Sequence, residues 1–449
     1  MHGIERRVLR MVTPSPEEQS RIEAAARGLV ERVRLAAAEL GLRGEPLLVG
    51  SVAKGTHLTH PDIDVFFLFP PDVPREELEE KGLELGMRVL GGIRRYAEHP
   101  YIRGEFGGFE AEVVPCYRIT DTAQRMSAVD RTPFHTRFVA ERITDAQRAE
   151  VRLLKSFLKG IGAYGAEEAV RGFSGYLAEL LVLKFESFRA VLEAASRWSG
   201  RVELSLDGAR GCPDERHSPL LFSDPVDPSR NVASALSLEK FSLFVAASQS
   251  YLRRPSMKFF FPRPPVPMTR SELAAMLRRR GTELVGIGLR TPSVVPDIYY
   301  SQLRKFERGI AALCEEHGFR LLASSFHEAG GQTVFIFEFE VGRLPRVMVH
   351  KGPPVGNPRA PDFIGKWRRS TKRMSAPHIR EGLWAVEVRR DHTTAAELIQ
   401  ASIERLSLGR HLSEEVRRGY RLLTGVELLT RELALALTLH FDKRFPWER

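Results

Sequence analysis

The feature that most constrains the fold is the segment of residues 50–64, Gly-Ser-Val-Ala-Lys-Gly-Thr-His-Leu-Thr-His-Pro-Asp-Ile-Asp. Its two aspartates lead into the apolar run Val-Phe-Phe-Leu-Phe, whose composition is typical of a strand. Because side chains alternate along a strand, Asp62 and Asp64 are expected to share one face. Two carboxylates so close repel each other unless a cation lies nearby, so the segment favours a metal site.

The residues ahead of these aspartates supply groups that bind phosphate. Gly50 lets backbone amides approach an anion closely, Ser51 adds a hydroxyl, and Lys54 adds a point charge. The segment is not a Walker P-loop, because the Gly-Lys-Ser/Thr order is missing. Phosphate donors beside two carboxylates predict metal-assisted phosphoryl chemistry. The alternative is a solvated strand edge with incidental acids.

A third carboxylate is expected on a neighbouring strand. Residues 109–115, Phe-Glu-Ala-Glu-Val-Val-Pro, have strand composition and carry two glutamates. Glu110 and Glu112 face the same side of such a strand, so spacing alone does not choose between them.

The remaining elements predict an α+β protein with several domains, since 449 residues exceed one core. A helix capped at Ser15 and stopped at Gly41 precedes a small mixed sheet, and a helix of about 25 residues follows Pro74. A proline-rich linker at 261–267 separates a helical region from a mixed one. Further helices are expected at 146–159, 174–194, 236–252, 300–316, 395–405 and 427–440, and further strands at 47–49, 286–290, 332–341 and 383–388.

Composition favours a polyanionic partner and argues against a membrane protein. The formal net charge is +10, and basic clusters at 278–280 and 366–373 suit RNA, although either cluster alone could be a solvated helix face. No apolar run approaches the roughly 20 residues that span a bilayer, and the N-terminus lacks the apolar region of a signal peptide. The three cysteines, Cys116, Cys212 and Cys314, match no zinc spacing and favour a reducing, cytoplasmic setting.

Several motifs together resemble one family. Residues 50–64 are similar to the nucleotidyltransferase signature of the DNA polymerase β superfamily, and the joint pattern resembles class I, archaeal-type CCA-adding enzymes. The motifs that carry this likeness are residues 112–117, 130–135, 152–155, 172–176, 224–232, 299–304, 342–345 and 350–355.

This resemblance implies an activity and a domain plan. The expected activity is addition of CCA to the tRNA 3′ end from CTP and ATP, without a nucleic-acid template and with release of pyrophosphate. The expected plan is a polymerase-β-like head at 1–141, a helical neck at 142–260, and an α+β body and tail at 261–449 that binds the tRNA acceptor stem and 3′ end. A homodimer is compatible with the sequence, which does not determine the oligomeric state.

The resemblance also implies roles for named residues. Asp62, Asp64 and Glu112 would hold Mg²⁺, which decides between the two glutamates. The family usually has Asp at the third position, so Glu112 is a departure that moves a ligand by about 1 Å. Arg230 would help to recognise the base, unless it pairs with Asp227 or a helix cap. The incoming nucleotide would be bound by Gly50, Ser51, Lys54, His135, Lys155 and Tyr164.

Two alternatives remain open at this point. Another transferase of the superfamily, of the poly(A)- or oligoadenylate-forming type, would share the head but should lack the Arg230 loop together with the Gly-Pro-Pro segment at 352–354. An inactive RNA-binding relative should have lost a carboxylate, and none is lost here.

Overall fold

The computed structural model describes residues 3–96, 100–206, 208 and 218–449, so Cys212 lies outside the described residues. The chain forms two compact units, Met1–Pro264 with Arg444–Arg449, and Pro265–Lys443. The last six residues belong to the first unit, where the Trp447 ring stacks on Phe259 at 5.1 Å between ring centroids. The three-domain plan with boundaries near 141 and 260 stays a prediction.

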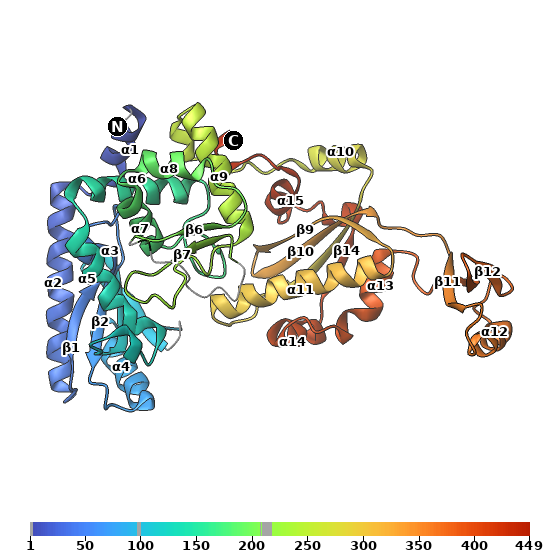
Figure 1. Ribbon diagram of the computed structural model, residues 1–449, viewed down its shortest axis with the longest axis horizontal. Helices are drawn as coiled ribbons and strands as arrows, with labels where there is room; N and C mark the ends of the chain where they lie inside the picture. Colours follow the sequence, from blue (N-terminus) through green and yellow to red (C-terminus); the bar gives the residue numbers. More distant parts are fainter. Residues whose placement is uncertain (1–2, 97–99, 207, 209–217) are drawn as a thin grey trace. The chain divides into compact units, whose positions relative to one another are not determined.

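A five-stranded sheet forms the base of the first unit. Its order is β1-β2-β5-β4-β3, and only the central β2–β5 pair is parallel. Helices α2 and α4 cover one face of this sheet (Figure 1). The bounds are β1 Glu45–Val49, β2 Ile63–Phe69, β3 Ile93–Tyr96, β4 Pro100–Phe106, β5 Phe109–Tyr117, α2 Pro16–Glu39 and α4 Arg75–Leu90.

Side chains alternate between the two faces of the sheet along β2, and this alternation determines on which face Asp64 lies at the start of the strand. Val65 and Phe67 pack into the core beneath α2 and α4, whereas Phe66 and Leu68 belong to a smaller cluster on the opposite face. Asp64 follows the second set, so its carboxylate is on the face that α2 and α4 leave uncovered.

The expected limits of α2 are confirmed, and those of α4 are wrong. The Ser15 hydroxyl accepts from the Glu18 amide at 3.1 Å, and Gly41 with φ +65° follows the helix end. Helix α4 has 16 residues rather than about 25, because Gly91 adopts φ +56° and ends it. The chain then forms the β3–β4 hairpin, which the sequence analysis missed.

A helical layer completes the first unit. The helix expected at 174–194 is two helices, because Glu186 at φ +71° ends α7 and Ser187 caps α8. The aromatic core of this layer is centred on Phe157, which contacts the rings of Phe188 and Tyr251. The bounds are α1 Gly3–Val12, α3 Gly50–Lys54, α5 Thr132–Arg142, α6 Asp145–Gly160, α7 Gly175–Phe185, α8 Phe188–Ala195, α9 Leu238–Arg253, β6 Val202–Leu204 and β7 Leu220–Phe222, with 3₁₀ turns at Thr122–Gln124, Ala128–Arg131, Met257–Phe259 and Pro446–Glu448.

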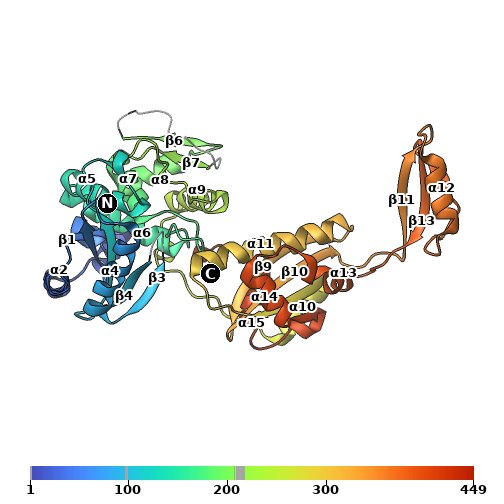
Figure 2. The ribbon, with the colours of Figure 1, turned by 90° about the horizontal axis from the view of Figure 1, so that it is seen from below.

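The second unit is built on a four-stranded antiparallel sheet of order β14-β8-β10-β9. One face packs against α11, α13 and α14, and the other against α10 and α15. The two sets of helices lie on opposite sides of the sheet in Figure 1 and overlap in the turned view of Figure 2. The helix expected at 427–440 is wrong over its first half, where a 3₁₀ turn, Gly425–Leu428, precedes α15. The bounds are β8 Glu283–Arg290, β9 Arg320–Ala329, β10 Gln332–Val341, β14 Arg421–Thr424, α10 Arg270–Arg280, α11 Pro296–Glu316, α13 Ala395–Ser402, α14 Arg410–Arg418 and α15 Ala434–Phe441, with a 3₁₀ turn at Ile403–Arg405.

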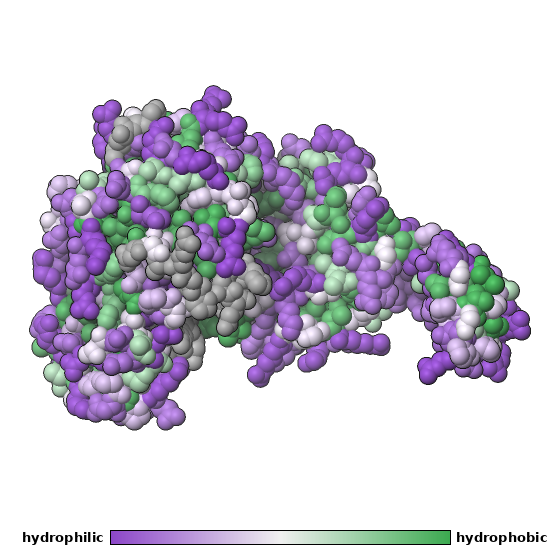
Figure 3. Space-filling model, in the orientation of Figure 1, coloured by the Kyte–Doolittle hydropathy of each residue, from purple (hydrophilic) through white to green (hydrophobic). Residues whose placement is uncertain are grey.

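A second, three-stranded sheet of order β11-β13-β12 belongs to the same unit and packs against α12. These elements are β11 Val347–Pro354, β12 His378–Arg380, β13 Leu383–Arg389 and α12 Ala360–Arg369. Hydrophilic side chains dominate the visible molecular surface (Figure 3), in keeping with a chain in which 28% of residues are charged. Among the described residues, no helix combines the length and apolar character needed to cross a bilayer.

Candidate active site

The sheet brings the predicted carboxylates together at the start of β2. Asp64 lies opposite Glu112 in the parallel β2–β5 register, and Asp62 immediately precedes β2. The Glu112 side chain is 20% exposed, whereas Glu110, two residues earlier on β5, is 60% exposed. The register therefore favours Glu112 as the neighbour of Asp64, and we call Asp62, Asp64 and Glu112 the carboxylate cluster.

An arginine of β4 lies among these acids. The Arg103 guanidinium is 3.8 Å from both Asp62 Oδ2 and Glu112 Oε1, and it also pairs with Glu110. Burial and, to a lesser extent, the negative charge of Glu110 raise the pKa of Asp62, so the structure keeps both glutamates near the cluster. Sequence reasoning missed Arg103, because the hairpin that carries it was not predicted.

The carboxylate cluster has an excess of negative charge. Burial, followed by repulsion from Glu112 and Asp62, raises the pKa of Asp64 to about 7. Burial likewise raises the pKa values of Asp62 and Glu112. Nowhere in the described residues do three acidic, His or Cys side chains form a ready-made metal cage. Even so, three neighbouring carboxylates with raised pKa values are a donor set that suits a hard divalent cation.

Gly50 makes room for this cluster. The predicted Gly-Ser turn is the start of the short helix α3, and Gly50 enters it with φ +73°. A Cβ atom on Gly50 would lie 2.0 Å from Asp64 Oδ2. Both the backbone conformation and the close approach therefore require glycine at this position.

A cavity of about 360 Å³ joins Asp62 and Asp64, but not Glu112, to the phosphate-binding candidates. It is lined by Asp62 and Asp64 and, from helix α6, by Lys155 and Lys159. The Lys159 ammonium lies 5.4 Å from the centre of the Tyr164 ring. The cavity thus collects seven of the residues singled out from the sequence: Gly50, Ser51, Lys54, Asp62, Asp64, Lys155 and Tyr164.

Two of the lysines share one buried carboxylate that the sequence analysis missed. Glu179 Oε2 accepts from Lys54 Nζ at 2.6 Å, and Glu179 Oε1 accepts from Lys155 Nζ at 2.9 Å and from Thr56 Oγ1 at 2.5 Å. Burial alone would raise the pKa of Glu179, but Lys155 and Lys54 outweigh it and lower the pKa to about 2. We call Lys54, Lys155 and Glu179 the lysine cluster.

Helix α6 also fixes the backbone that follows α3. Arg148 and Arg152, one helical turn apart, donate to the Lys54 carbonyl at 3.1 Å and to the His57 carbonyl at 2.8 Å. Lys155 continues this row and donates to the Thr56 carbonyl at 3.2 Å. The phosphate-binding segment and α6 are therefore held together by several charge-assisted hydrogen bonds.

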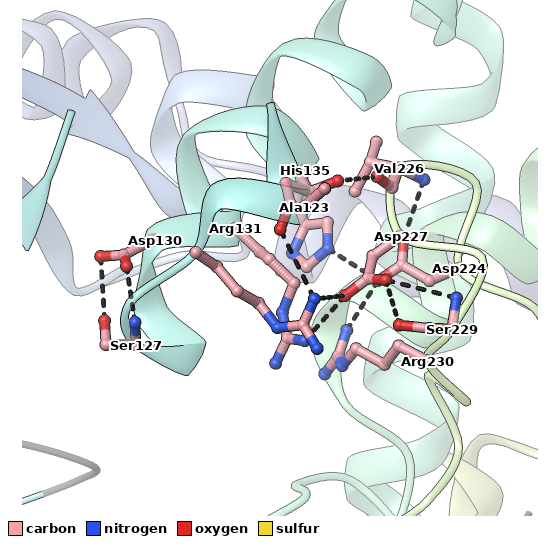
Figure 4. A network of polar contacts seen from close by, with 12 residues as sticks. Ala123, Ser127, Asp130, Arg131, His135, Asp224, Val226, Asp227, Ser229 and Arg230 are labelled. Atoms are coloured by element: carbon pink, nitrogen blue, oxygen red, sulfur yellow. Dashed lines mark hydrogen bonds and ion pairs between the residues drawn. The ribbon is translucent and has the colours of Figure 1, made fainter. Parts of the chain in front are cut away.

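His135 and Arg230 do not line the cavity but meet at Asp224 (Figure 4). Asp224 Oδ2 lies 2.8 Å from His135 Nε2 and accepts from Arg230 Nη1 at 2.9 Å. The His135 ring stacks on Tyr176 with 4.0 Å between centroids, and Tyr176 does line the cavity. The partner of Arg230 is thus Asp224, whereas Asp227 is held by Arg131 at 2.9 Å.

Comparisons with known proteins match almost the whole chain. Family models match at residues 30–135 (nucleotidyltransferase domain), 149–261 (tRNA nucleotidyltransferase, second domain) and 280–425 (CCA-adding enzyme, C-terminal domain). The CCA-adding enzyme of Methanosarcina barkeri is 37% identical over 426 residues, which cover 93% of this chain and 92% of that protein. The chain belongs to the CCA-adding enzyme family.

Other members of the family match equally well. The CCA-adding enzyme of Methanothermobacter thermautotrophicus is 38% identical over 429 residues, covering 92% of this chain and 91% of that protein. That of Haloarcula marismortui is 36% identical over 454 residues and covers 96% of each chain. A solved structure of the Cid1 poly(U) polymerase aligns with 56% of this chain and 94% of that chain, with 14% identity and a TM-score of 0.46.

Membership of the CCA-adding enzyme family confirms the predicted class of activity. The chain is a tRNA nucleotidyltransferase of the archaeal type that adds CCA without a nucleic-acid template. It belongs to a superfamily of metal-dependent enzymes with a polymerase-β-like nucleotidyltransferase domain in an α+β, multidomain chain.

Proposed function

We propose that Asp62, Asp64 and Glu112 hold Mg²⁺ for nucleotide transfer to the tRNA 3′-hydroxyl. The observation that carries this proposal is the register that sets Asp64 beside Glu112, with Asp62 next to the same strand. A divalent ion bound there would lower the pKa of the attacking hydroxyl and stabilise the leaving oxygens. It would also offset the burial and the repulsion that together raise the pKa of Asp64 to about 7.

The triphosphate of CTP or ATP would be bound by Ser51, Lys54, Lys155 and Tyr164. Their common cavity, next to Asp62 and Asp64, supports this assignment. After pairing with Glu179, the two lysines retain one net positive charge for the phosphates. A cavity of this size accommodates part of a nucleotide triphosphate and leaves the base to contacts at its rim.

Recognition of the base would fall to Arg230 and His135. Both are held by Asp224, and His135 is stacked on a tyrosine of the cavity wall. The guanidinium of Arg230 is 30% exposed, so it keeps donors for a ligand while one is used by Asp224.

The tRNA acceptor stem and 3′ end are the proposed macromolecular partner. In the basic cluster at 278–280, Arg280 forms a bidentate ion pair with the buried Glu338, with hydrogen bonds of 2.6 and 2.9 Å. Arg278 and Arg279 are exposed. In the cluster at 366–373, Lys366 lies 5.7 Å from the centre of the Trp367 ring. These exposed charges suit phosphate contacts that recognise a stem by shape and weaken with salt.

The finer organisation is part of the same proposal. The head, neck, and body and tail would be residues 1–141, 142–260 and 261–449, a plan that the three matched family ranges support. Cytoplasmic location is supported by the free thiols of Cys116 and Cys314. Assembly as a homodimer is left to a measurement of mass in solution.

The test is incorporation into tRNA that lacks its terminal CCA. With Mg²⁺ and labelled nucleotides, the intact chain should add C, C and A in order when CTP and ATP are both present, and two C residues with CTP alone. Indiscriminate addition of A would favour a poly(A)-type enzyme, and tRNA binding without incorporation would favour an inactive relative. Near-normal incorporation by the Asp62→Ala or Asp64→Ala variant would overturn the metal assignment.

A further inference from the structure

Glu179 stands out as a buried charge in the active site to which no role has been assigned. It lies on α7, and its side chain is 0% exposed although it belongs to the lining of the cavity. An ionised carboxylate is costly to bury unless it is paired and fully hydrogen-bonded. Glu179 meets that condition through three donors, from two lysines and Thr56.

The contacts of Glu179 connect segments that are far apart in the chain. Lys54 ends α3 and Thr56 follows it, whereas Lys155 lies on α6. Lys155 also donates to the Thr56 carbonyl at 3.2 Å and to its hydroxyl at 3.1 Å. One carboxylate thus fixes the positions of both ammonium groups relative to each other, which an unpaired lysine on its flexible stem would not achieve.

Glu179 also sets the net charge of the lysine cluster, which forms the proposed phosphate-binding wall of the cavity. Two ammonium groups and one carboxylate leave a net charge of +1, whereas the lysines alone would carry +2. In a partly buried site, one unit of charge changes the affinity for a polyanion strongly. Since every cycle of nucleotide addition must release pyrophosphate, a wall that binds phosphates too tightly would slow turnover.

We infer that Glu179 is a positioning residue that holds Lys54 and Lys155 in place and limits the affinity of the site for the pyrophosphate product. This inference rests on the proposed role of the two lysines in binding the triphosphate. It goes beyond that role because it assigns product release to a group that does not itself bind phosphate.

The test measures binding of inorganic pyrophosphate with Mg²⁺ to the full chain by calorimetry. The Glu179→Gln variant should bind pyrophosphate about tenfold more tightly than the parent and show lower kcat together with lower KM for CTP. The matched variant Glu179→Asp keeps the charge and should stay within about threefold of the parent Kd. An unchanged Kd in a folded Glu179→Gln variant would overturn the inference.

A second pair of variants covers the case in which Glu179→Gln alone does not fold. In the Lys155→Gln background the wall carries no net charge, and adding Glu179→Gln restores +1 without leaving two unpaired lysines. The double variant should bind pyrophosphate about tenfold more tightly than Lys155→Gln. Equal affinity of the two would refute the inference about Glu179.

The lysine variant separates this inference from the proposal beneath it. If Lys155→Gln binds pyrophosphate as well as the parent does, the lysine is not a phosphate ligand and the proposed function of the wall fails. If Lys155→Gln weakens binding while the Glu179 variants leave it unchanged, only the inference about Glu179 fails.

Discussion

The candidate active site contains two clusters of charged side chains, which differ in how their buried charges of like sign are compensated. In the lysine cluster, a buried carboxylate compensates two ammonium groups, and its pKa is lowered to about 2. In the carboxylate cluster, Asp62 and Glu112 share the partly exposed Arg103, and the pKa of Asp64 is raised to about 7. The first cluster compensates its own charge, whereas the second retains an excess of negative charge that a divalent cation would compensate under the proposed function.

The largest expected effect follows from this asymmetry. Asp64→Asn should lower incorporation of CMP by about 10³-fold or more, because it removes a charge that only the metal can use. Lys155→Gln should cost less, about 10–100-fold, because the Lys54 ammonium can still donate hydrogen bonds to the phosphates, although Glu179 cancels its charge. The measurement is single-turnover addition to tRNA lacking CCA. Equal losses of CMP incorporation in the two variants would contradict the proposed difference between the carboxylate cluster and the lysine cluster.

The choice between the two glutamates of β5 gives the next largest effect. Glu112→Gln should lower kcat by about 10²-fold, since Glu112 lies opposite Asp64, whereas the exposed Glu110→Gln should lower it by less than about threefold. Both variants remove one charge from the same strand, so each is the control for the other. The reverse ranking would make Glu110, which pairs with the same Arg103 as Asp62, the third ligand.

The sequence predicts the carboxylate cluster far better than the lysine cluster. Asp64 lies on β2 and Asp62 immediately precedes this strand, and the face of Glu112 on β5 follows from the period of two along a strand. Lys54 and Glu179 are 125 positions apart and meet only because the fold places α7 beside the end of α3. No local spacing specifies such a pair, and the one signal in the sequence is that Glu179 is the only acidic residue of α7, which is otherwise mostly apolar.

The predicted ends of two helices were wrong because a single residue ended each helix although the apolar period of the sequence continued. The apolar period of α4 continues past Leu90, but Gly91 at φ +56° ends the helix and leads into the hairpin that carries Arg103. Similarly, Glu186 at φ +71° divides one periodic stretch into α7 and α8. Positive φ at a residue other than glycine is a tertiary effect that propensity does not reveal.

A smaller effect should appear in stability without metal. Because the folded-state pKa of Asp64 is about 7, above its ordinary value of 3.8, ionisation of Asp64 costs the folded state stability as pH rises from about 4 to 7. In EDTA, Asp64→Asn should therefore gain roughly 5 °C in Tm over the parent at pH 8 and little at pH 4. Thermal melts across this range measure the difference.

An exposed aspartate supplies the control for that experiment. Asp72 pairs with Arg43 at the surface, which lowers its pKa, so Asp72→Asn should show no gain that grows with pH. If Asp64→Asn also shows none, the carboxylate cluster is not strained by its own charge and the contrast with the lysine cluster disappears.

The smallest effect concerns the one arginine that the carboxylates already have. The guanidinium of Arg103 is 3.8 Å from Asp62 and Glu112 and 32% exposed, so it compensates the cluster weakly. Arg103→Gln should therefore tighten Mg²⁺ binding by about threefold in calorimetry and lower the Tm of the metal-free chain. Arg94→Gln on the adjacent strand β3 is the matched control and should change neither value. Weaker Mg²⁺ binding by Arg103→Gln would mean that the arginine orients the ligands, so that the carboxylate cluster, like the lysine cluster, is arranged by an internal partner.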